Sequence, residues 1–235
     1  CTMTNVHGAE AYADNAALTF DGTVFSGDLK WYADAYSEAD VYAYYPYNTN
    51  GTPAAYAAVL DQTAGIAQAD FMAAAKKGVL PTPNAITMVF KHLMTKLVIN
   101  IDNQSGAEVN TVKILGGDAA CDIDLPNLAV LPASGAMPDI LTEITAYEAT
   151  AGKVWQAIVI PQTAKLSVEV SLSNGKKITQ PLAEMTLKSG GQYSINARLL
   201  QDDMTVSGSG EIENWTDEGE IGFEGEGTTE ELPVE

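Results

Sequence analysis

Two histidines and two cysteines are the residues of this 235-residue chain that would first suggest catalysis or metal binding. Cys1 and Cys121 can form one disulfide at most, and they cannot supply a four-cysteine zinc site. The sequence leaves open whether this pair is bridged. His7 lies in an irregular segment, and His92 lies in a strand-like pattern. A single histidine on a strand is more often packed and hydrogen-bonded than catalytic, so neither histidine predicts an active site.

Other patterns that could carry chemistry are also weak. A serine nucleophile on a glycine elbow needs G-x-S-x-G, which the chain lacks. The GSG at 208–210 falls in a predicted strand, where the glycines serve backbone geometry. The segment DNQSG at 102–106 does not match a calcium-binding loop and instead predicts a hairpin turn. No spacing nominates a pair of catalytic carboxylates. We therefore expect no enzymatic activity, no cofactor and no metal site.

Tyrosine is concentrated in ADVYAYYPYN, residues 39–48. Strand alternation places Val41, Ala43 and Tyr45 on one face, and Pro46 ends the ladder because it has no N–H to donate. Two interpretations remain open. The segment is a strand with one face in the core and the other half covered, or it is a platform on which a sugar or peptide stacks. The rings of such a platform would be Tyr42, Tyr44, Tyr45 and Tyr47.

The chain is strongly acidic, with 31 Asp and Glu against 12 Lys and Arg and a net charge of −19. Such a charge repels polyanions, so nucleic acid is not an expected partner. Arg198 is the only arginine, which disfavours bidentate binding of phosphate. Ten of the carboxylates lie between Glu211 and Glu235, and the glycine-rich acidic segment after Trp215 predicts a flexible tail over 217–235. No apolar run reaches the roughly 18 to 20 residues of a membrane-spanning helix.

The position of Cys1 at the start of the sequence has two interpretations. Exported bacterial lipoproteins begin, after their signal is removed, with a cysteine that carries the lipid. Alternatively, the chain was cut or built to start there, partway through a strand. The segment TMTNVHG that follows is shorter and less polar than the usual lipoprotein tether. Cys1 is therefore a lipidation candidate whose role the sequence does not decide.

Alternation with a period of two residues predicts antiparallel strands in the second half of the chain. In KLSVEVSLSNGKK, every second residue is apolar, and Asn174–Gly175 supplies the positive φ angles of a tight hairpin turn. The apolar residues of this pattern are Leu166, Val168, Val170 and Leu172. GGQYSINARLL repeats the pattern. MVFKHLMTKLVINID and VWQAIVIPQT predict long strands, and MTVSGSGEIENW predicts a last strand with a bulge.

Helix signals are few. AQADFMAAAKKG predicts a short helix, because Asp70 can cap an alanine-rich run that stops at Gly78. TPAAYAAVLD is a second candidate for a short helix. The fold class is therefore mainly β with one or two short helices. The proline-punctuated segment GVLPTPNA, residues 78–85, predicts a boundary between two domains.

Several short motifs, taken in order, resemble the fimbrillin family, whose Mfa-like members are pilins and anchors of anaerobic gut and oral bacteria. VYAYYPY is similar to the family's tyrosine-rich strand, DFMAAA follows it, and FKHLMTK at 90–96 is similar to F-x-H-x-x-A/S-K. AIVIPQT, LKSGGQYSINARL and a final I-x-x-W at Ile212–Trp215 then follow in the family order. The resemblance covers roughly residues 18 to 216.

The resemblance implies two transthyretin-like antiparallel β-sandwich domains over residues 1–84 and 85–216, followed by the acidic flexible tail over 217–235. The first domain would lack its first strands. Fimbrillins are exported lipoproteins that form or anchor thin pili at the cell surface and outer membrane. In the family, a protease removes an N-terminal strand, and the open groove receives a strand from the next subunit.

A structural or adhesive pilus subunit is therefore the expected function, and other pilin subunits are the expected partners. Host or bacterial surface proteins or glycans are further expected partners, and a lipid on Cys1 would be the only contact with a membrane. The alternative is a surface β-sandwich that binds glycans or proteins and does not polymerise. In that case the tyrosine platform would be the binding site.

Overall fold

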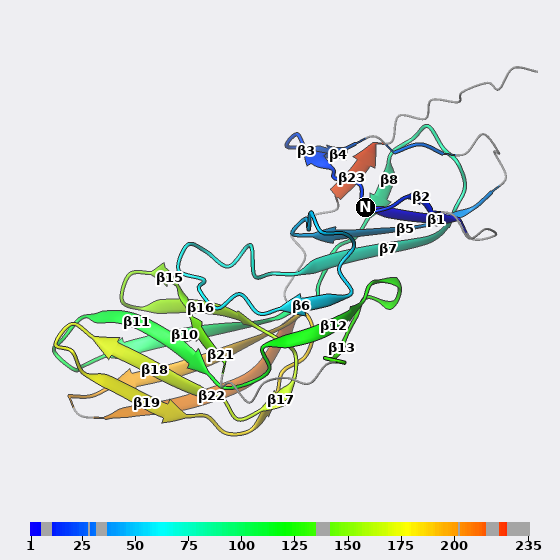
Figure 1. The fold of residues 1–235 in the computed structure, drawn as a ribbon. Helices are drawn as coiled ribbons and strands as arrows, with labels where there is room; N and C mark the ends of the chain where they lie inside the picture. Colours follow the sequence, from blue (N-terminus) through cyan, green and yellow to red (C-terminus); the bar gives the residue numbers. More distant parts are fainter. Residues whose placement is uncertain are drawn as a thin grey trace, which may run out of the picture.

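The computed structural model describes residues 1–5, 11–27, 29–31, 37–134, 142–201, 203–214 and 221–224. His7, Trp215 and the predicted tail apart from 221–224 lie outside the described residues. The described chain consists of strands and one short 3-10 helix, η1 (Leu125–Asn127), which confirms the mainly β class. In Figure 1 the molecule is elongated, with one group of sheets formed by the early strands and a second formed by the later ones. No helix in the described part of the chain is long and apolar enough to cross a membrane.

The later strands form a sandwich of a five-stranded sheet, in the order β15-β16-β10-β21-β22, and a four-stranded sheet, in the order β14-β11-β18-β19. Apolar side chains from both sheets meet in one core, which includes Ile99, Ile114 and Val168 with no exposed surface. The strands are β10 (Thr95–Asn103), β11 (Val109–Leu115), β14 (Glu143–Thr145), β15 (Tyr147–Thr150), β16 (Val154–Val159), β18 (Ser167–Leu172), β19 (Lys177–Pro181), β21 (Gly191–Leu199) and β22 (Met204–Asn214).

The predicted alternation is confirmed in this sandwich. Leu166, Val168, Val170 and Leu172 are all buried, and β18 pairs with β19 through a turn in which Gly175 has a φ of 84°. That φ lies in the left-handed region, which glycine adopts without steric cost. In β22, the pairing register shifts between Ser209 and Glu213, so the predicted bulge includes Gly210 at the end of the glycine-rich segment.

The early strands form two further sheets, a five-stranded one in the order β2-β1-β5-β7-β9 and a four-stranded one in the order β3-β4-β23-β8. Val41 and Ala74 of the five-stranded sheet pack in the cluster that also contains Met88 of the four-stranded sheet. The strands are β1 (Thr2–Asn5), β2 (Ala11–Ala13), β3 (Thr19–Phe20), β4 (Val24–Ser26), β5 (Ala39–Tyr45), β7 (Met72–Val79), β8 (Ile86–Met88), β9 (Lys91–His92) and β23 (Ile221–Glu224).

The other face of β5 and β7 packs against later parts of the chain. Tyr44 and Phe71 belong to a cluster that also contains Ile123, Ile158 and Ile160. The sheet is therefore buried on both faces, which demands apolar or small side chains at successive positions rather than at alternate ones. A three-stranded sheet, β13-β12-β6, and the pair β17–β20 complete the fold. Their bounds are β6 (Ala55–Ala57), β12 (Ala120–Asp124), β13 (Ala129–Pro132), β17 (Thr163–Ala164) and β20 (Met185–Thr186).

Both predicted helices are wrong. AQADFMAAAKKG contributes all but the last residue of strand β7, and TPAAYAAVLD contains strand β6. The alanines of β7 suit a helix by intrinsic propensity, but Ala73 and Ala74 have no exposed surface and each lies against a different core. Only small side chains fit where a central strand is enclosed on both faces, so tertiary packing overrides the helix propensity.

The long strand predicted over MVFKHLMTKLVINID is divided in two. β9 ends at His92 in the N-terminal five-stranded sheet, and β10 begins at Thr95 in the sandwich. Between them, Leu93 and Met94 are buried and cross from one sheet to the other. This crossing segment, 93–94, lies several residues beyond the domain boundary that the sequence predicts, and β8 and β9 still belong to the N-terminal sheets. β6 pairs with β12, so an early strand and a later one also share the separate three-stranded sheet. The limits 1–84 and 85–216 stay a prediction.

The turn predicted over DNQSG is present, but it does not form a hairpin. β10 pairs with β16 and β21, whereas β11 pairs with β14 and β18. The turn therefore carries the chain from one layer of the sandwich to the other. Sequence spacing alone cannot separate these two kinds of turn, because both join two strands over a few polar residues.

Gln62 closes part of a sheet edge with its side chain. Its carboxamide donates to the carbonyl of Ile158 at 2.8 Å and accepts from the N–H of Ile158 at 2.8 Å. A third bond runs from Nε2 to the carbonyl of Val59 at 2.9 Å, and Gln62 is only 1% exposed. The amide thus imitates a neighbouring strand at a point that β15 does not reach, since β15 pairs with β16 only as far as Gln156.

We expect Gln62→Ala to lower the free energy of unfolding by about 3 kcal/mol, because both backbone groups of Ile158 lose a buried partner. Chemical denaturation measures the change. Gln201→Ala is the matched control, since Gln201 is exposed and its replacement should change stability by less than about 0.5 kcal/mol. Equal stability of the two variants would show that the edge at Ile158 does not depend on this amide.

Candidate functional site

The first candidate site is the position of β23 in the N-terminal four-stranded sheet. β23 pairs in parallel with β4, with Phe223 opposite Phe25, and antiparallel with β8, with Gly222 opposite Thr87. A strand from the end of the chain therefore lies between two strands from its first 90 residues (Figure 1). The sequence predicts an acidic flexible tail here, and the structure differs at these four residues because two short strands hold them in place.

β23 supplies backbone pairing to strands that are themselves very short. β4 and β8 have three residues each, and β23 has four. Without β23, the facing edges of β4 and β8 would present unpaired N–H and C=O groups, which template the addition of another strand. The position of β23 is thus a place where an extended segment is held by main-chain hydrogen bonds on both sides. We call it the β23 slot.

An apolar pocket of about 280 Å³ lies beside the N-terminal sheets. Its walls include Cys1, Phe25 of β4 and Tyr45 of β5. At its mouth, Phe20 and Tyr47 are 49% and 47% exposed, and the ring of Phe20 contacts that of Phe25 at a centroid distance of 4.8 Å. Apolar pockets of this kind accept an apolar side chain or the apolar part of a ligand.

The tyrosine segment is divided between core and surface. Tyr42 and Tyr44 are each 8% exposed, and the ring of Tyr44 stacks on Phe71 at 5.8 Å. Tyr45 is half-buried, and Tyr47 is exposed. The Tyr42 hydroxyl donates to Asp40 at 3.1 Å, and burial, followed by this carboxylate, raises the pKa of Tyr42 to about 12. Within the segment, Tyr45 and Tyr47 have the ring surface that a ligand could reach, and ligand binding there stays a prediction.

The two cysteines are free thiols, so the bridge that the sequence left open is not formed. They lie on opposite faces of β5 and β7, Cys1 in the cluster with Met88 and Cys121 in the cluster with Tyr44. Burial, and then the charges of nearby aspartates, raise the pKa of the Cys121 thiol to about 12. Attachment of a lipid to Cys1 would require its buried side chain to leave the apolar cluster, and lipidation stays a prediction.

His92 is held by a buried carboxylate that the sequence does not indicate. Its Nδ1 lies 2.8 Å from Oδ2 and 3.0 Å from Oδ1 of Asp70, which is 7% exposed. Lys96 is partly buried nearby, and desolvation lowers its pKa while the charge of Asp70 opposes this effect. Asp70 precedes β7, and His92 and Lys96 lie on either side of the crossing segment. The Asp70–His92 pair therefore lies within the N-terminal sheets beside the crossing segment, and His92 is packed and hydrogen-bonded as the sequence predicts.

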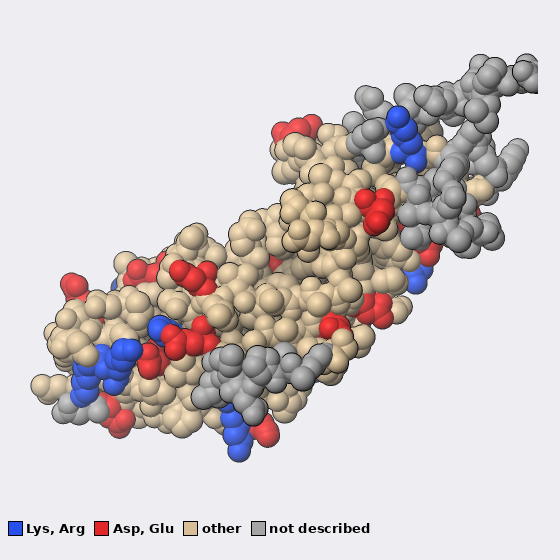
Figure 2. All heavy atoms as spheres, in the orientation of Figure 1, with Lys and Arg blue, Asp and Glu red and all other residues tan. Residues whose placement is uncertain are grey.

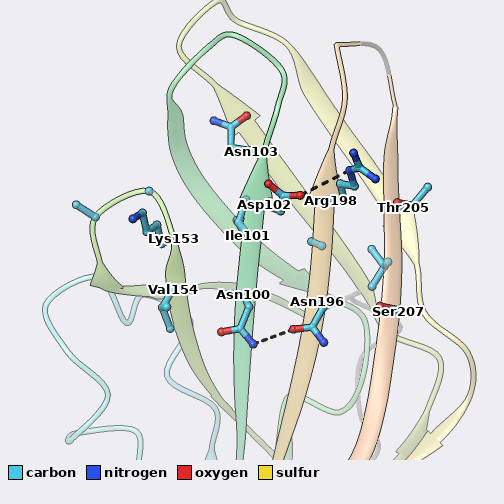
Figure 3. Close-up of a pocket in the computed structure, with 14 residues that line it drawn as sticks. Asn100, Ile101, Asp102, Asn103, Lys153, Val154, Asn196, Arg198, Thr205 and Ser207 are labelled. Atoms are coloured by element: carbon cyan, nitrogen blue, oxygen red, sulfur yellow. Dashed lines mark hydrogen bonds and ion pairs between the residues drawn. The ribbon is translucent and has the colours of Figure 1, made fainter.

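A polar pocket of about 870 Å³ lies on the outer face of the five-stranded sheet of the sandwich (Figure 3). Asn100 and Asp102 project from β10, and Asn196 and Arg198 project from β21. Alternation of the strands places these side chains outward, because Ile99, Ile101 and Ala197 point into the core. The sequence pattern indicated outward positions here, but it did not indicate that they form a hollow.

Acidic side chains are spread over both groups of sheets on the face shown in Figure 2, and Lys and Arg are fewer. This distribution agrees with the predicted repulsion of polyanions. Among the described residues, no three His, Cys, Asp or Glu side chains are grouped so that they could hold a metal ion.

The described chain is an all-β protein in which a late strand fills a slot between two early ones, and comparison with known families assigns it further. A family model described as "Fimbrillin-like" matches residues 2–215. The chain therefore belongs to the fimbrillin-like family, which confirms the resemblance inferred from its motifs. No curated protein sequence matches the chain.

Several solved structures are similar to the chain. A candidate cell adhesion protein from Bacteroides ovatus has 26% sequence identity and a TM-score of 0.61, over 79% of this chain and 71% of that one. A candidate cell adhesion protein from Bacteroides uniformis has 21% identity and a TM-score of 0.59, over 76% and 73%. A fimbrial protein from Bacteroides vulgatus has 12% identity and a TM-score of 0.56, over 92% and 91%. The last two likenesses concern the fold.

We expect Tyr44→Ala to lower the free energy of unfolding by about 3 to 5 kcal/mol, because it removes a ring that is packed against Phe71. Tyr47→Ala is the control and should cost less than about 1 kcal/mol, since its ring is 47% exposed. Urea denaturation of both variants measures the difference. A Tyr44 variant as stable as the wild type would place that ring outside the core.

We expect Cys121 to resist alkylation by iodoacetamide at pH 8 in the folded protein, because a thiol pKa of about 12 leaves almost no reactive thiolate. The Cys1→Ala background makes Cys121 the only thiol, and mass spectrometry counts the adducts. Reaction should become fast when urea unfolds the chain and the pKa returns to the ordinary value. Rapid modification of the folded chain would contradict the burial of this thiol.

Proposed function

We propose that the chain is a structural and adhesive subunit of a cell-surface pilus, located in the fimbrium at the outer membrane, and that subunits assemble by strand donation. The observation that carries this proposal is the pairing of β23 with both β4 and β8. In the assembled state, residues 221–224 of one subunit would occupy the β23 slot of the next. Other copies or related pilins are then the partners, and the role is structural rather than catalytic.

The energetics of the β23 slot support an exchange of strands. A donated segment makes the same backbone hydrogen bonds whether it comes from its own chain or from a neighbour. The self-filled monomer and the strand-exchanged assembly therefore differ mainly in which chain the strand belongs to. A strand of four residues is a small cooperative unit, and small units open at low free-energy cost. The neighbouring apolar pocket, lined by Phe25 of β4, would add side-chain contacts for an incoming segment.

Membership of the fimbrillin-like family supports the pilus role, and similarity to the candidate cell adhesion protein of Bacteroides ovatus supports the adhesive role. The alternative from the sequence, a surface module that binds glycans or proteins without polymerising, predicts a monomer under every condition. Oligomerisation therefore separates the two functions.

Two variants that are defective in complementary ways test strand donation. Gly222→Pro damages the donor strand, because proline donates no hydrogen bond and Gly222 pairs on both sides. Thr87→Pro damages the acceptor edge of β8 in the same way. We expect each variant alone to remain monomeric and the equimolar mixture to form dimers, because one variant keeps the donor and the other keeps the slot. Mass photometry measures the dimer fraction.

Circular dichroism and thermal unfolding of each variant first establish that both are folded. A synthetic peptide of residues 217–228 then provides a second measurement. It should bind a chain that ends at Asn214, whereas the same peptide with Gly222→Pro should not. Strand donation through residues 221–224 would be excluded if the mixture remains monomeric and the chain that ends at Asn214 does not bind the peptide.

A further inference from the structure

The polar pocket of about 870 Å³ lies on the outer face of the five-stranded sheet of the sandwich, rather than at an edge at which strands pair. Its floor is formed by the C-terminal ends of β10 and β21, over Asn100 to Asn103 and Asn196 to Arg198. These strand ends lie away from the crossing segment. β16 and its turn form one wall through Lys153 and Val154, and β22 forms the other. The β23 slot belongs to the N-terminal sheets, so the two sites are separate (Figure 1).

Paired carboxamides occupy the floor of this polar pocket. Nδ2 of Asn100 donates to Oδ1 of Asn196 at 3.0 Å across the parallel strands β10 and β21. In Figure 3 the carbonyl oxygen of Asn100 and the amide nitrogen of Asn196 point away from this bond. The pair therefore fixes the orientation of both side chains and leaves one acceptor and one donor outside this bond.

A second network fixes the charged groups at the rim. Arg198 Nε lies 3.6 Å from Oδ2 of Asp102, and Arg198 Nη2 donates to Gln104 Oε1 at 2.9 Å. Gln104 in turn donates to Asp102 at 3.1 Å. The guanidinium and the carboxylate remain 57% and 61% exposed, so further N–H groups and oxygens of this network face solvent. Thr205 and Ser207 add hydroxyl groups on the opposite wall.

A peptide strand is a poor occupant for this polar pocket. β10 pairs with β16 and β21, and β21 pairs with β10 and β22. The two strands of the floor are therefore interior strands, whose backbone groups are already used. A ligand must be recognised by side chains, which here supply amide, hydroxyl, carboxylate and guanidinium groups over a broad hollow rather than a ladder of main-chain partners.

The charge of the polar pocket favours a neutral ligand. The lining carries one carboxylate, Asp102, and two cations, Lys153 and Arg198, and Arg198 is already paired with Asp102. The chain as a whole has a net charge of −19, which repels anions on approach. A neutral molecule with many hydroxyl groups can bond to both donors and acceptors of the pocket, and the negative charge of the chain does not repel it. The volume is in the range of ligand sites, about 300 to 1,000 Å³.

From these observations we propose that the polar pocket binds a neutral oligosaccharide, whose hydroxyl groups bond to the carboxamides of Asn100 and Asn196 and to the Asp102–Arg198 network. This site is distinct from the tyrosine segment, which would recognise sugar by stacking on rings. It gives the subunit an adhesive surface that stays exposed whether or not the β23 slot is filled. If the polar pocket binds no oligosaccharide, the proposal of strand donation is unaffected. If strand donation fails, the proposal of oligosaccharide binding is likewise unaffected.

The experiment uses an array of printed neutral and sialylated oligosaccharides. The full chain carries a biotin at its C-terminus and is presented as a streptavidin tetramer, because multivalent display compensates for the weak affinity of single sugar sites. We expect retention on neutral oligosaccharides. Asn100→Ala combined with Asn196→Ala should reduce the affinity for the best-bound neutral oligosaccharide by about tenfold or more, measured by isothermal titration with the unbiotinylated chain.

Ser194→Ala is the matched control, since Ser194 faces outward on β21 but does not line the polar pocket. It should bind as the wild type does, and thermal unfolding should show that all variants are folded. The proposal is overturned if no neutral oligosaccharide is retained, if retention is confined to sialylated ones, or if the double variant binds as well as the wild type. Loss of binding in Tyr47→Ala but not in the double variant would also overturn it and place the site at the tyrosine segment.

Discussion

Backbone pairing at the edges of sheets is the constraint on which the rest of this structure depends. An all-β chain with many short strands has many edges, and each edge exposes N–H and C=O groups that must be paired or covered. Gln62 covers one edge by binding both backbone groups of Ile158 with a single side chain. β23 pairs two others at once, between β4 and β8. The first solution is a buried side chain that lies 96 residues from its partner in the sequence, whereas the second is a strand of four residues.

Burial on both faces explains the unusual composition of β5 and β7. One face of this sheet meets the four-stranded N-terminal sheet, and the other meets β12 and the strand ends of the sandwich. Small alanines in β7 are buried on both faces, while Tyr42 and Tyr44 of β5 pack in one core, and the Tyr42 hydroxyl donates to Asp40. The same packing decides which tyrosines a ligand can reach, because rings that complete a core cannot also form a surface.

In a fibre built by the proposed strand donation, the junction between the two groups of sheets would carry the load between subunits. The crossing segment is held on both sides, since the N–H of Leu93 donates to Phe71 at 2.8 Å and the carbonyl of Met94 accepts from Gly190 at 3.0 Å. The Asp70–His92 pair adds a polar contact next to this segment. A load applied at the β23 slot would therefore pass to the sandwich through hydrogen bonds and a buried core rather than through a single chain. The polar pocket lies beyond this junction, where it can bind without disturbing it.

The sequence by itself determined the β class, the inward faces of β18 and β21, the Asn174–Gly175 hairpin and the family, because these depend on local alternation, turn chemistry and motif order. It also indicated that His92 would be packed. The tertiary structure alone decided that the alanine-rich segment is a strand and that DNQSG joins two layers. It likewise decided that Asp70 pairs with His92, that residues 221–224 enter an early sheet and that outward asparagines line a hollow. Each of these depends on contacts between residues far apart in the chain, where the energy of burial and of backbone pairing exceeds local preference.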